Sequence, residues 1–440
     1  MLVFVENKTS RVLYITDFVI RQLLGFELIV TEDIHFFQKS EDIKINYSLN
    51  VKSNSDFFLP PYSLLFQTDI HQQDTNITNF FALPCFFEVK NKESNFPFDI
   101  FAAAFWLITR YEEYLPTQRD NHGRFNAKKS LAYQEDFLRL PIIHLWTHHF
   151  YLALKCKFPN ISNPQRKVFN FRPSYDIDMA WAYCEKGFAR TVGGVLKDMQ
   201  KGHFGEVYNR LLVLSRKKKD PFDSYDFLEG LHQKYNIHPI FFFLLGDFGK
   251  FDKNISPKNK NLFLLVQKIH QKYDVGIHPS YGSNKKSNQV KNEIDRLTNI
   301  TQEKVIDSRQ HFLKLSLPHT YQRLIKCGIK NDYSMGYAAD IGFRAGVATP
   351  FLWYDLEKEE TTDLKIHPFQ VMDVTLRNYL KLNPTEAFER VLKIINVTKS
   401  IGGTFMTLWH NSSFAERDGW DAEWKDLYEK IVAEAVKSTS

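Results

Sequence analysis

Strand-like and helix-like segments alternate through the second part of this chain. Apolar runs typical of strands occupy residues 168–178, 238–247, 274–280, 304–312, 329–337, 369–378 and 402–411. The segments between them have helical spacing, and the longest spans residues 186–235. Strands separated by helices of this length form parallel βαβ units. The pattern predicts an α/β fold, and seven strands favour a sheet that closes as a barrel.

A different pattern precedes this one. Short strand-like runs at 11–20, 26–33 and 63–69 are followed by two helical segments, 98–115 and 137–155. Strands and helices segregated in this way predict an α+β domain. Residues 157–167 are rich in Pro, Asn, Ser and charge, which is the composition of a linker. We therefore expect an α+β domain over residues 1–160 and a barrel over residues 168–440.

Polar side chains gather where the strand-like runs end. They are Asp176 and Asp178, Asp247, His278, Arg309 and His311, Asp340, and His410. In α/β barrels the active site is built at the carboxyl ends of the strands, from the loops that lead into the helices. Taken singly, each residue is better explained as a solvated or capping side chain. Their position at one common edge predicts a functional site.

The stretch SYDIDMAW places two acids one residue apart. Asp176 and Asp178 follow a strand-like run, and residues i and i+2 of a strand point to the same face. Two carboxylates on one face repel each other unless something offsets the charge. A metal ion would do so, and a solvated loop is the alternative.

The composition narrows the class of protein. The chain has 57 Lys and Arg against 51 Asp and Glu, and a net charge of +6 over 440 residues is too small to predict nucleic-acid binding. Four separated cysteines without a CxxC pair indicate neither a zinc knuckle nor a disulfide framework, which favours a reducing compartment. No signal peptide and no apolar stretch long enough for a membrane span are recognised, so a cytoplasmic location is expected.

Several stretches resemble motifs of the polysaccharide deacetylases, metal-dependent hydrolases that remove acetyl groups from glycans. They are SYDID, GIHPSYGSN, SRQHFL and TLWHN, within residues 168–415. The resemblance implies a distorted (β/α)7 barrel and a carbohydrate substrate. The stretch FDIFAAAFWLITRYEEYLPTQRDNHGRF is similar to an uncharacterised domain that precedes such deacetylases in Bacteroidota proteins.

The resemblance also implies a divalent metal, with zinc as the expected ion. Asp178 and His278 match two of the family's ligands. The family's second histidine falls on Gly282, which has no side-chain donor. A catalytic zinc site normally uses three protein ligands. His311 is therefore the expected replacement, and Asp247 is a weaker candidate.

The catalytic roles follow from the same resemblance. Asp176 matches the general base, and Arg309 matches the arginine that holds it. His410 matches the general acid, which protonates the leaving amine after water attacks the acetyl carbonyl. Asp340 is the expected aspartate that tunes His410, with Asp332 as its rival.

Three further residues are expected to contact substrate. Leu408 matches the position that lines the acetyl pocket, and Tyr281 and Trp409 are expected to pack against sugar faces. Ordinary packing at the barrel rim explains the two aromatic residues equally well.

The expected activity is deacetylation of an N-acetylated sugar or polysaccharide precursor. Gly282 favours a second hypothesis, an inactive deacetylase-like barrel that binds glycan or protein. A glycoside hydrolase is a third hypothesis, but it needs two carboxylates across a cleft. Asp176 and Asp178 lie on one strand and do not fit that requirement.

Overall fold

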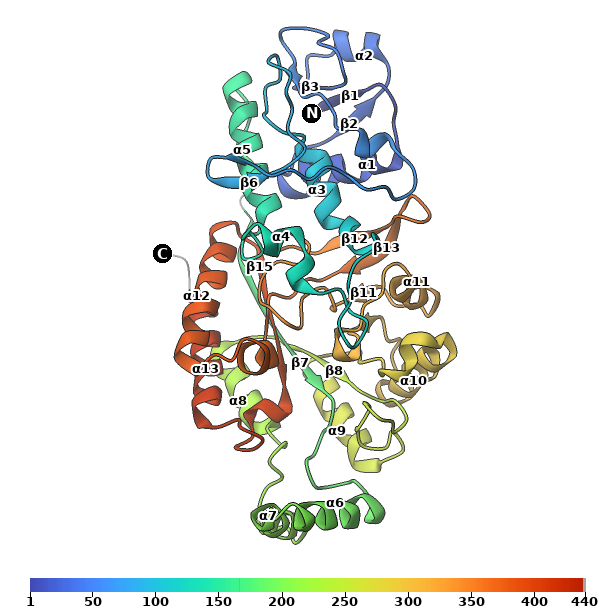
Figure 1. Ribbon diagram of the computed structural model, residues 1–440, viewed down its shortest axis with the longest axis vertical. Helices are drawn as coiled ribbons and strands as arrows, with labels where there is room; N and C mark the ends of the chain where they lie inside the picture. The colour runs from blue at the N-terminus through green and yellow to red at the C-terminus, as the bar shows by residue number, and fades with distance from the viewer. Residues whose placement is uncertain (166, 438–440) are drawn as a thin grey trace.

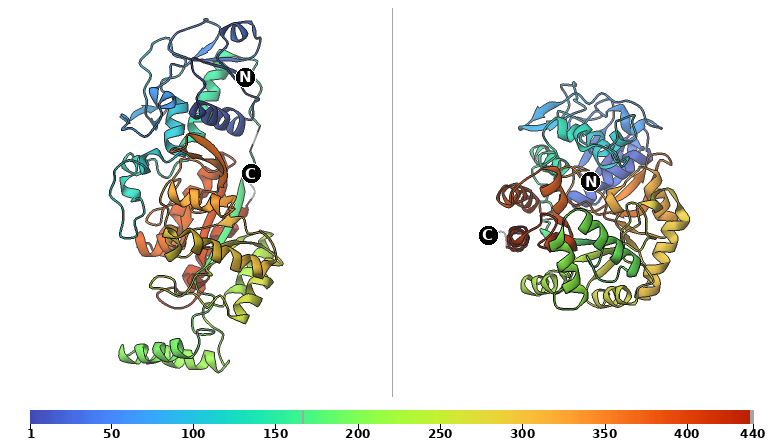
Figure 2. Two further views of the ribbon diagram at one scale, coloured as in Figure 1. Left: turned by 90° about the vertical axis from the view of Figure 1, so that its right-hand side faces the viewer. Right: turned by 60° about the horizontal axis from the view of Figure 1, so that its bottom comes forward.

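The computed structural model describes residues 1–165 and 167–437. The molecule is elongated, with the first region of the chain at one end and a helical hairpin, formed by α6 (Phe188–Gln200) and α7 (Phe204–Leu214), at the other (Figure 1). The second region, which lies between them, carries the larger sheet. A view turned by 90° shows the same order along the long axis (Figure 2).

The first region contains a four-stranded sheet. Its strands are ordered β2-β1-β3-β4, with bounds β1 (Leu2–Val5), β2 (Ile29–Thr31), β3 (Lys44–Tyr47) and β4 (Phe57–Phe58). All three neighbouring pairs are parallel. Parallel strands need crossover connections, so this sheet is of the α/β kind and not the α+β kind that was predicted.

Two of the strands predicted in this region are helical. Residues 11–20 fall in α1 (Ser10–Thr16) and the π-helix η1 (Asp17–Leu23). The side chain of Thr9 caps α1 by accepting from the Val12 N–H, and the apolar residues bury one helical face. Residues 63–69 begin with the 3-10 helix η2 (Ser63–Phe66). Smaller elements are α2 (Ile34–Lys39), β5 (Thr78–Phe80) and β6 (Leu83–Cys85).

The two helices predicted in the first region are present. All nine residues of α3 (Ile100–Ile108) are buried, and Asp99 caps the helix by accepting from the Phe101 and Ala102 N–H groups. The second helix is α5 (Ile142–Lys157). Between them lie η3 (Tyr111–Glu113), η4 (Ala127–Lys129) and α4 (Leu131–Gln134).

The second region carries a nine-stranded sheet in the order β12-β13-β11-β10-β9-β8-β7-β15-β14. Every neighbouring pair is parallel except β12 with β13. The bounds are β7 (Asn170–Ile177), β8 (Ile240–Phe243), β9 (Asp274–Ile277), β10 (Asp307–Ser308), β11 (Asn331–Asp332), β12 (Phe351–Asp355), β13 (Glu360–Ile366), β14 (Val371–Met372) and β15 (Thr404–His410). The predicted alternation of strands and helices is confirmed, but β12 and β13 were missed.

The closed seven-stranded barrel is not found among the described residues. The ladder is open, because β12 and β14 are its two edges. However, β13 and β14 are separated by only residues 367–370, although they pair at opposite ends of the sheet. Four residues span at most about 14 Å. The sheet therefore curls until its ends are near each other, and the carboxyl ends of its strands converge.

Helices cover the outside of this sheet. On one flank lie α8 (Tyr225–Tyr235), α12 (Pro384–Ser400) and α13 (Ala422–Val436), and on the other lie α9 (Lys260–His270), α10 (Ser287–Thr301) and α11 (His319–Lys326) (Figure 1). Short helical turns are η5 (Gly282–Lys285), η6 (His311–Leu313), η7 (Thr375–Tyr379) and η8 (Asn411–Phe414). Within the described residues, no helix combines the length and the apolar character needed to cross a bilayer.

Candidate metal centre and active site

A pocket of about 190 Å³ lies at the carboxyl ends of β7, β9 and β15. Its lining combines carboxylates, imidazoles and apolar side chains: Arg124, Asp176, Asp178, His278, His311, Phe312, Leu313, Met372, Val374, Tyr379, Leu408 and His410. Most of the polar residues predicted from the strand ends therefore meet in one place.

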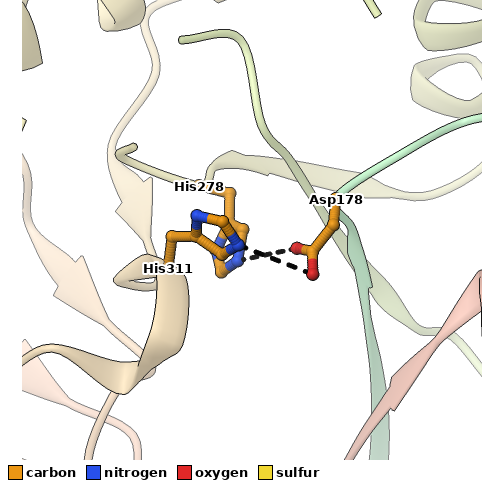
Figure 3. Close-up of side chains that lie close together, drawn as sticks. All are labelled: Asp178, His278 and His311. Carbon is orange, nitrogen blue, oxygen red and sulfur yellow. Dashed lines mark ion pairs between the residues drawn. The ribbon is translucent and has the colours of Figure 1, made fainter. Parts of the chain in front are cut away.

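Three potential metal ligands converge at this pocket. One ligand atom each from Asp178, His278 and His311 lies within 4.8 Å of the other two (Figure 3). Asp178 Oδ1 is 3.2 Å from His278 Nε2, and Asp178 Oδ2 is 3.6 Å from His311 Nε2. Ligands bound tetrahedrally to zinc at about 2.0–2.1 Å lie about 3.3–3.4 Å apart. The donor spacing therefore fits a small divalent cation.

The surroundings of His278 decide which of its ring nitrogens carries the proton. His278 Nδ1 lies 2.6 Å from the backbone carbonyl oxygen of Arg309, which can only accept, so Nδ1 donates. Nε2 then presents a lone pair to Asp178 Oδ1, a buried atom without a hydrogen-bond partner among the described residues. Two lone pairs at this separation repel unless a second proton or a cation lies between them, and the buried, unpartnered oxygen fits a cation.

His311 is oriented by a carboxylate that sequence reasoning missed. Asp252 Oδ1 lies 2.9 Å from His311 Nδ1, so this nitrogen donates and Nε2 faces the pocket. Asp252 is itself fixed by the backbone N–H groups of Tyr281 and Gly282, at 2.8 and 3.2 Å. The backbone N–H of Gly282 therefore helps to hold the carboxylate that orients His311.

The electrostatic environment favours a negative charge on Asp178 and a positive charge on His311. Burial alone would raise the pKa of Asp178, but His311, His278 and His410 outweigh it and hold that pKa well below the ordinary value. Burial opposes the charge of His311, whereas Asp178 and Asp252 raise its pKa to about 9. Asp247, the weaker ligand candidate, lies at the surface, where it pairs with Arg296.

Asp176 lies beside this trio on the same strand face as Asp178. Arg309 Nη1 donates to its Oδ1 at 3.0 Å, while its Oδ2 is 3.6 Å from His278 Nε2. Arg309 is fully buried, and its Nε donates to the carbonyl of Tyr333. The arginine therefore holds one oxygen of Asp176 and leaves the other toward the pocket.

His410 faces the pocket from β15, and its partner is Asp373 and not Asp340. Asp373 lies 2.9 Å from His410 Nδ1 and also accepts from the His410 N–H at 2.7 Å. Burial would lower the pKa of His410, but Asp373, Asp178 and Asp176 raise it to about 10. Asp340 instead accepts from the Ile341 N–H of its own loop, and the rival Asp332 from Ser334.

Two of the three predicted substrate contacts are placed elsewhere. Leu408 lines the pocket. Trp409 points away from it, because successive strand residues face opposite sides, and it is fully buried against Tyr428. Tyr281 is not among the lining residues and packs in an aromatic cluster with Phe251 and Phe312.

The first region of the chain contributes one wall of the pocket. Arg124 is buried, and its Nε is held by Asp120 Oδ2 at 2.7 Å. Its Nη1 donates to the carbonyl of Phe312 at 2.8 Å, and its Nη2 to the Tyr379 hydroxyl at 3.1 Å. Sequence reasoning missed Arg124 and Tyr379, because their place depends on how the two regions pack.

Comparison with known families covers the first region only. A family of unknown function, DUF7033, matches residues 1–159. The match includes Arg124 and ends just before the domain boundary predicted from the linker composition. No curated protein matches this chain.

Among solved structures, polysaccharide deacetylases resemble the chain at low identity. A putative polysaccharide deacetylase from Mycobacterium smegmatis is 13% identical, with a TM-score of 0.41, over 63% of this chain and 86% of that one. A probable one from Pseudomonas aeruginosa PAO1 is 10% identical, with a TM-score of 0.37, over 61% and 84%. A third, from Bacillus cereus, is 12% identical, with a TM-score of 0.28, over 61% and 88%. Identities of 10–13% and TM-scores below 0.5 assign no function to this chain.

Proposed function

We propose that this chain is a metal-dependent hydrolase that removes acetyl groups from an N-acetylated sugar or polysaccharide precursor. The observation that carries the proposal is the convergence of Asp178, His278 and His311 in one pocket. A divalent cation held by these three residues, zinc being the expected ion, would supply Lewis-acid chemistry at the acyl carbonyl.

Asp176 is suited to act as the general base. Its Oδ1 is fixed by the buried guanidinium of Arg309, and its Oδ2 is left free to accept a proton from a water molecule in the pocket. Because Arg309 is itself held by the Tyr333 carbonyl, the carboxylate keeps one orientation. A fixed base in hydrogen-bond reach of the attacking water lowers the barrier without reorganisation.

His410 is suited to act as the general acid. Asp373 accepts from its Nδ1, so the proton on Nε2 faces the pocket. With a pKa raised to about 10, His410 carries that proton at neutral pH. It can therefore donate to the amine that leaves when the carbon–nitrogen bond breaks.

The size and lining of the pocket support a small acyl group. Ligand pockets for whole drug-sized molecules have volumes of about 300–1,000 Å³, and this pocket is about 190 Å³. Leu408, Met372 and Val374 give it an apolar wall. An acetyl methyl group fits such a wall, with the sugar remaining outside. A cytoplasmic location and the lack of a nucleic-acid partner stay predictions from the sequence.

The test is acetate release from a panel of N-acetylated mono- and oligosaccharides by protein supplied with Zn²⁺ or Co²⁺. The wild type is expected to release acetate from at least one substrate. Asp176→Asn should keep the metal and lose about 10²–10⁴-fold in turnover, the usual contribution of a general base.

A matched control variant shows whether the loss of turnover is specific to a carboxylate in the pocket. Asp247→Asn changes an exposed carboxylate that pairs with Arg296 away from the pocket, and it should turn over like wild type. If metal-loaded wild type releases no acetate from any substrate of the panel, the deacetylase proposal is wrong. Glycan binding without turnover would then support the inactive-barrel hypothesis.

A further inference from the structure

The hairpin that follows β7 exposes an unusual amount of apolar surface. It consists of α6 (Phe188–Gln200) and α7 (Phe204–Leu214) and projects from the end of the molecule that is distant from the first region (Figures 1 and 2). No residue of α6 is buried. Helices of folded domains normally bury an apolar stripe, so this hairpin lacks a covering surface within the described chain.

The exposed apolar residues form a stripe on each helix. On α6 they recur at intervals of three or four, and on α7 they do the same: Phe188, Val192, Leu196 and Met199, then Phe204, Tyr208, Leu211 and Leu214. Phe188 is 86% exposed and Phe204 is 65% exposed. Residues spaced in this way share one face of a helix. Two such faces side by side make an apolar patch larger than scattered surface residues would give.

The same segment carries the positive charge of the protein. Residues 186–219 hold nine Lys and Arg against two Asp and Glu, a net charge of +7. Since the whole chain has a net charge of +6, the remaining residues sum to −1. The four basic residues of 216–219 belong to this concentration of charge. The hairpin therefore combines exposed apolar side chains with a high positive charge.

A basic groove lies between the hairpin and the loops of the sheet. Its volume is about 1010 Å³, and its cationic lining is Lys186, Arg190, Lys197, Lys201, Arg210, Lys253 and Arg417. Burial and the neighbouring Arg190, Arg210 and Arg417 lower the pKa of Lys186 to about 8. Asp198 and Glu206 also line the groove and pair with Arg210 and Arg417, so an anion would be stabilised chiefly by the remaining cations.

We propose that the α6–α7 hairpin binds the surface of an anionic membrane. The apolar stripes would enter the boundary between headgroups and acyl chains, and the Lys and Arg side chains on the polar faces of the two helices would be attracted to the anionic headgroups. Charge complementarity selects this occupant over a second copy of the chain, because two hairpins of net charge +7 repel each other. The hairpin follows Asp176 and Asp178 in the chain, so the binding surface lies on the loop side of the sheet, where the pocket opens.

The test is co-sedimentation with vesicles of phosphatidylcholine alone or with about a third phosphatidylglycerol, at low and high salt. The full-length wild type is expected to bind the anionic vesicles and to be released by salt. Lys197→Ala/Lys201→Ala should weaken binding about 25-fold, since each basic residue near an anionic surface contributes about 5-fold. Phe188→Ser/Phe204→Ser should weaken it at both salt concentrations, because it removes apolar insertion.

Matched controls lie in the first region. Phe81→Ser removes a side chain that is 71% exposed, and Lys90→Ala/Lys92→Ala removes two exposed charges. Both should bind vesicles like wild type, and all variants should keep the wild-type melting temperature. The proposal is overturned if the wild type does not bind anionic vesicles or binds neutral vesicles equally well. It is also overturned if the hairpin variants bind anionic vesicles as tightly as the wild type does. It is also overturned if light scattering shows a dimer that Phe188→Ser/Phe204→Ser dissociates, since the face would then join two copies.

Discussion

The pocket has two sides, and each contains a histidine whose Nδ1 is held by a buried carboxylate. On the β9–β10 side Asp252 orients His311, and on the β14–β15 side Asp373 orients His410. The first imidazole belongs to the group of potential metal ligands, together with His278. The second lies 3.8 Å from Asp178 Oδ2 but outside that group.

The difference shows how one chemical unit can serve two purposes. A carboxylate on Nδ1 fixes the tautomer and turns Nε2 inward in both cases. Where a second imidazole and a carboxylate share the same point, as at His311, Nε2 is placed to bind a cation. At His410, which lies 3.8 Å from Asp178 but outside the group of potential ligands, Nε2 is left to hold a proton. The neighbours of the ring, and not the ring itself, therefore decide its role.

The largest effects on metal binding and turnover are expected from removing the imidazole rings of His278 and His410. His278→Ala should weaken metal binding by more than about 100-fold, because even outer partners of metal ligands cost 10–100-fold. His410→Ala should keep the metal and lose about 10²–10⁴-fold in turnover as the general acid disappears. Metal titration and acetate release measure the two quantities. If both variants lost metal equally, His410 would contribute to metal binding as much as His278 does, and the two sides of the pocket would not differ in role.

Substituting the carboxylates that orient the two histidines, Asp252 and Asp373, is expected to have smaller effects that are more specific to each side of the pocket. Asp252→Asn should weaken metal binding about 10–100-fold, since it changes the partner that orients His311. Asp373→Asn should leave metal binding unchanged and lower turnover, because it removes the charge that keeps His410 protonated. The pH profile of Asp373→Asn should lose activity at lower pH than wild type, since activity falls as pH rises through the pKa of the acid. A metal defect in Asp373→Asn alone would reverse the assignment.

Arg124 connects the two sides, since it bonds to the carbonyl of Phe312 on one and to Tyr379 on the other. Arg124→Ala should raise the KM about 10-fold, the effect of losing roughly one hydrogen bond to a charged group, with metal content unchanged. Arg119→Ala is the control, because Arg119 belongs to the same loop, its side chain donates to the Glu113 carbonyl, and it does not line the pocket. A similar KM in wild type and Arg124→Ala would show that the first region does not shape the pocket.

Glu293 makes the β9–β10 side sensitive to pH. It is fully buried beneath the loop after β9, accepts from the Ser280 N–H and hydroxyl, and has its pKa raised to about 7, chiefly by burial. A folded-state pKa above the ordinary 4.5 means that the folded protein holds this proton more tightly than the unfolded chain. The stabilisation is therefore present below pH 4.5 and is lost as pH rises through 7.

Glu293→Gln does not titrate and should escape this loss. Its free energy of unfolding relative to wild type should rise between pH 4.5 and 8 by up to about 3 kcal/mol. Urea unfolding at the two pH values measures the difference. A constant difference between variant and wild type would mean that Glu293 does not titrate in this range.

Much of the second region could be predicted from its sequence. The alternation of strands and helices located β7, β8, β9 and β15, and the rule that sites lie at carboxyl ends placed Asp178, His278 and His311 at one edge. The same rule applies to Asp373, which directly follows β14, but the predicted run continued to residue 378 and hid this strand end. Strand alternation could have excluded Trp409, which neighbours two inward-facing residues.

Other features depend on packing that a linear pattern does not contain. Asp252 lies in a loop after β8, and only the fold brings it to His311. Arg124 reaches the pocket only because the two regions pack together. Residues 11–20 have strand-like composition, yet the Thr9 cap and burial of one helical face make them helical. β12 and β13 form an antiparallel pair at one edge of the open sheet, and β13 (ETTDLKI) is too polar to give a strong strand signal.

We propose that His311 supplies the third protein ligand of a metal site, since Gly282 has no side-chain donor. The direct measurement is the metal content of wild type, His311→Ala and His410→Ala, purified without chelator and then equilibrated with one equivalent of Zn²⁺. About one ion per chain is expected in wild type and in His410→Ala, and far less in His311→Ala. No ion in wild type, or a full ion in His311→Ala, would contradict this proposal.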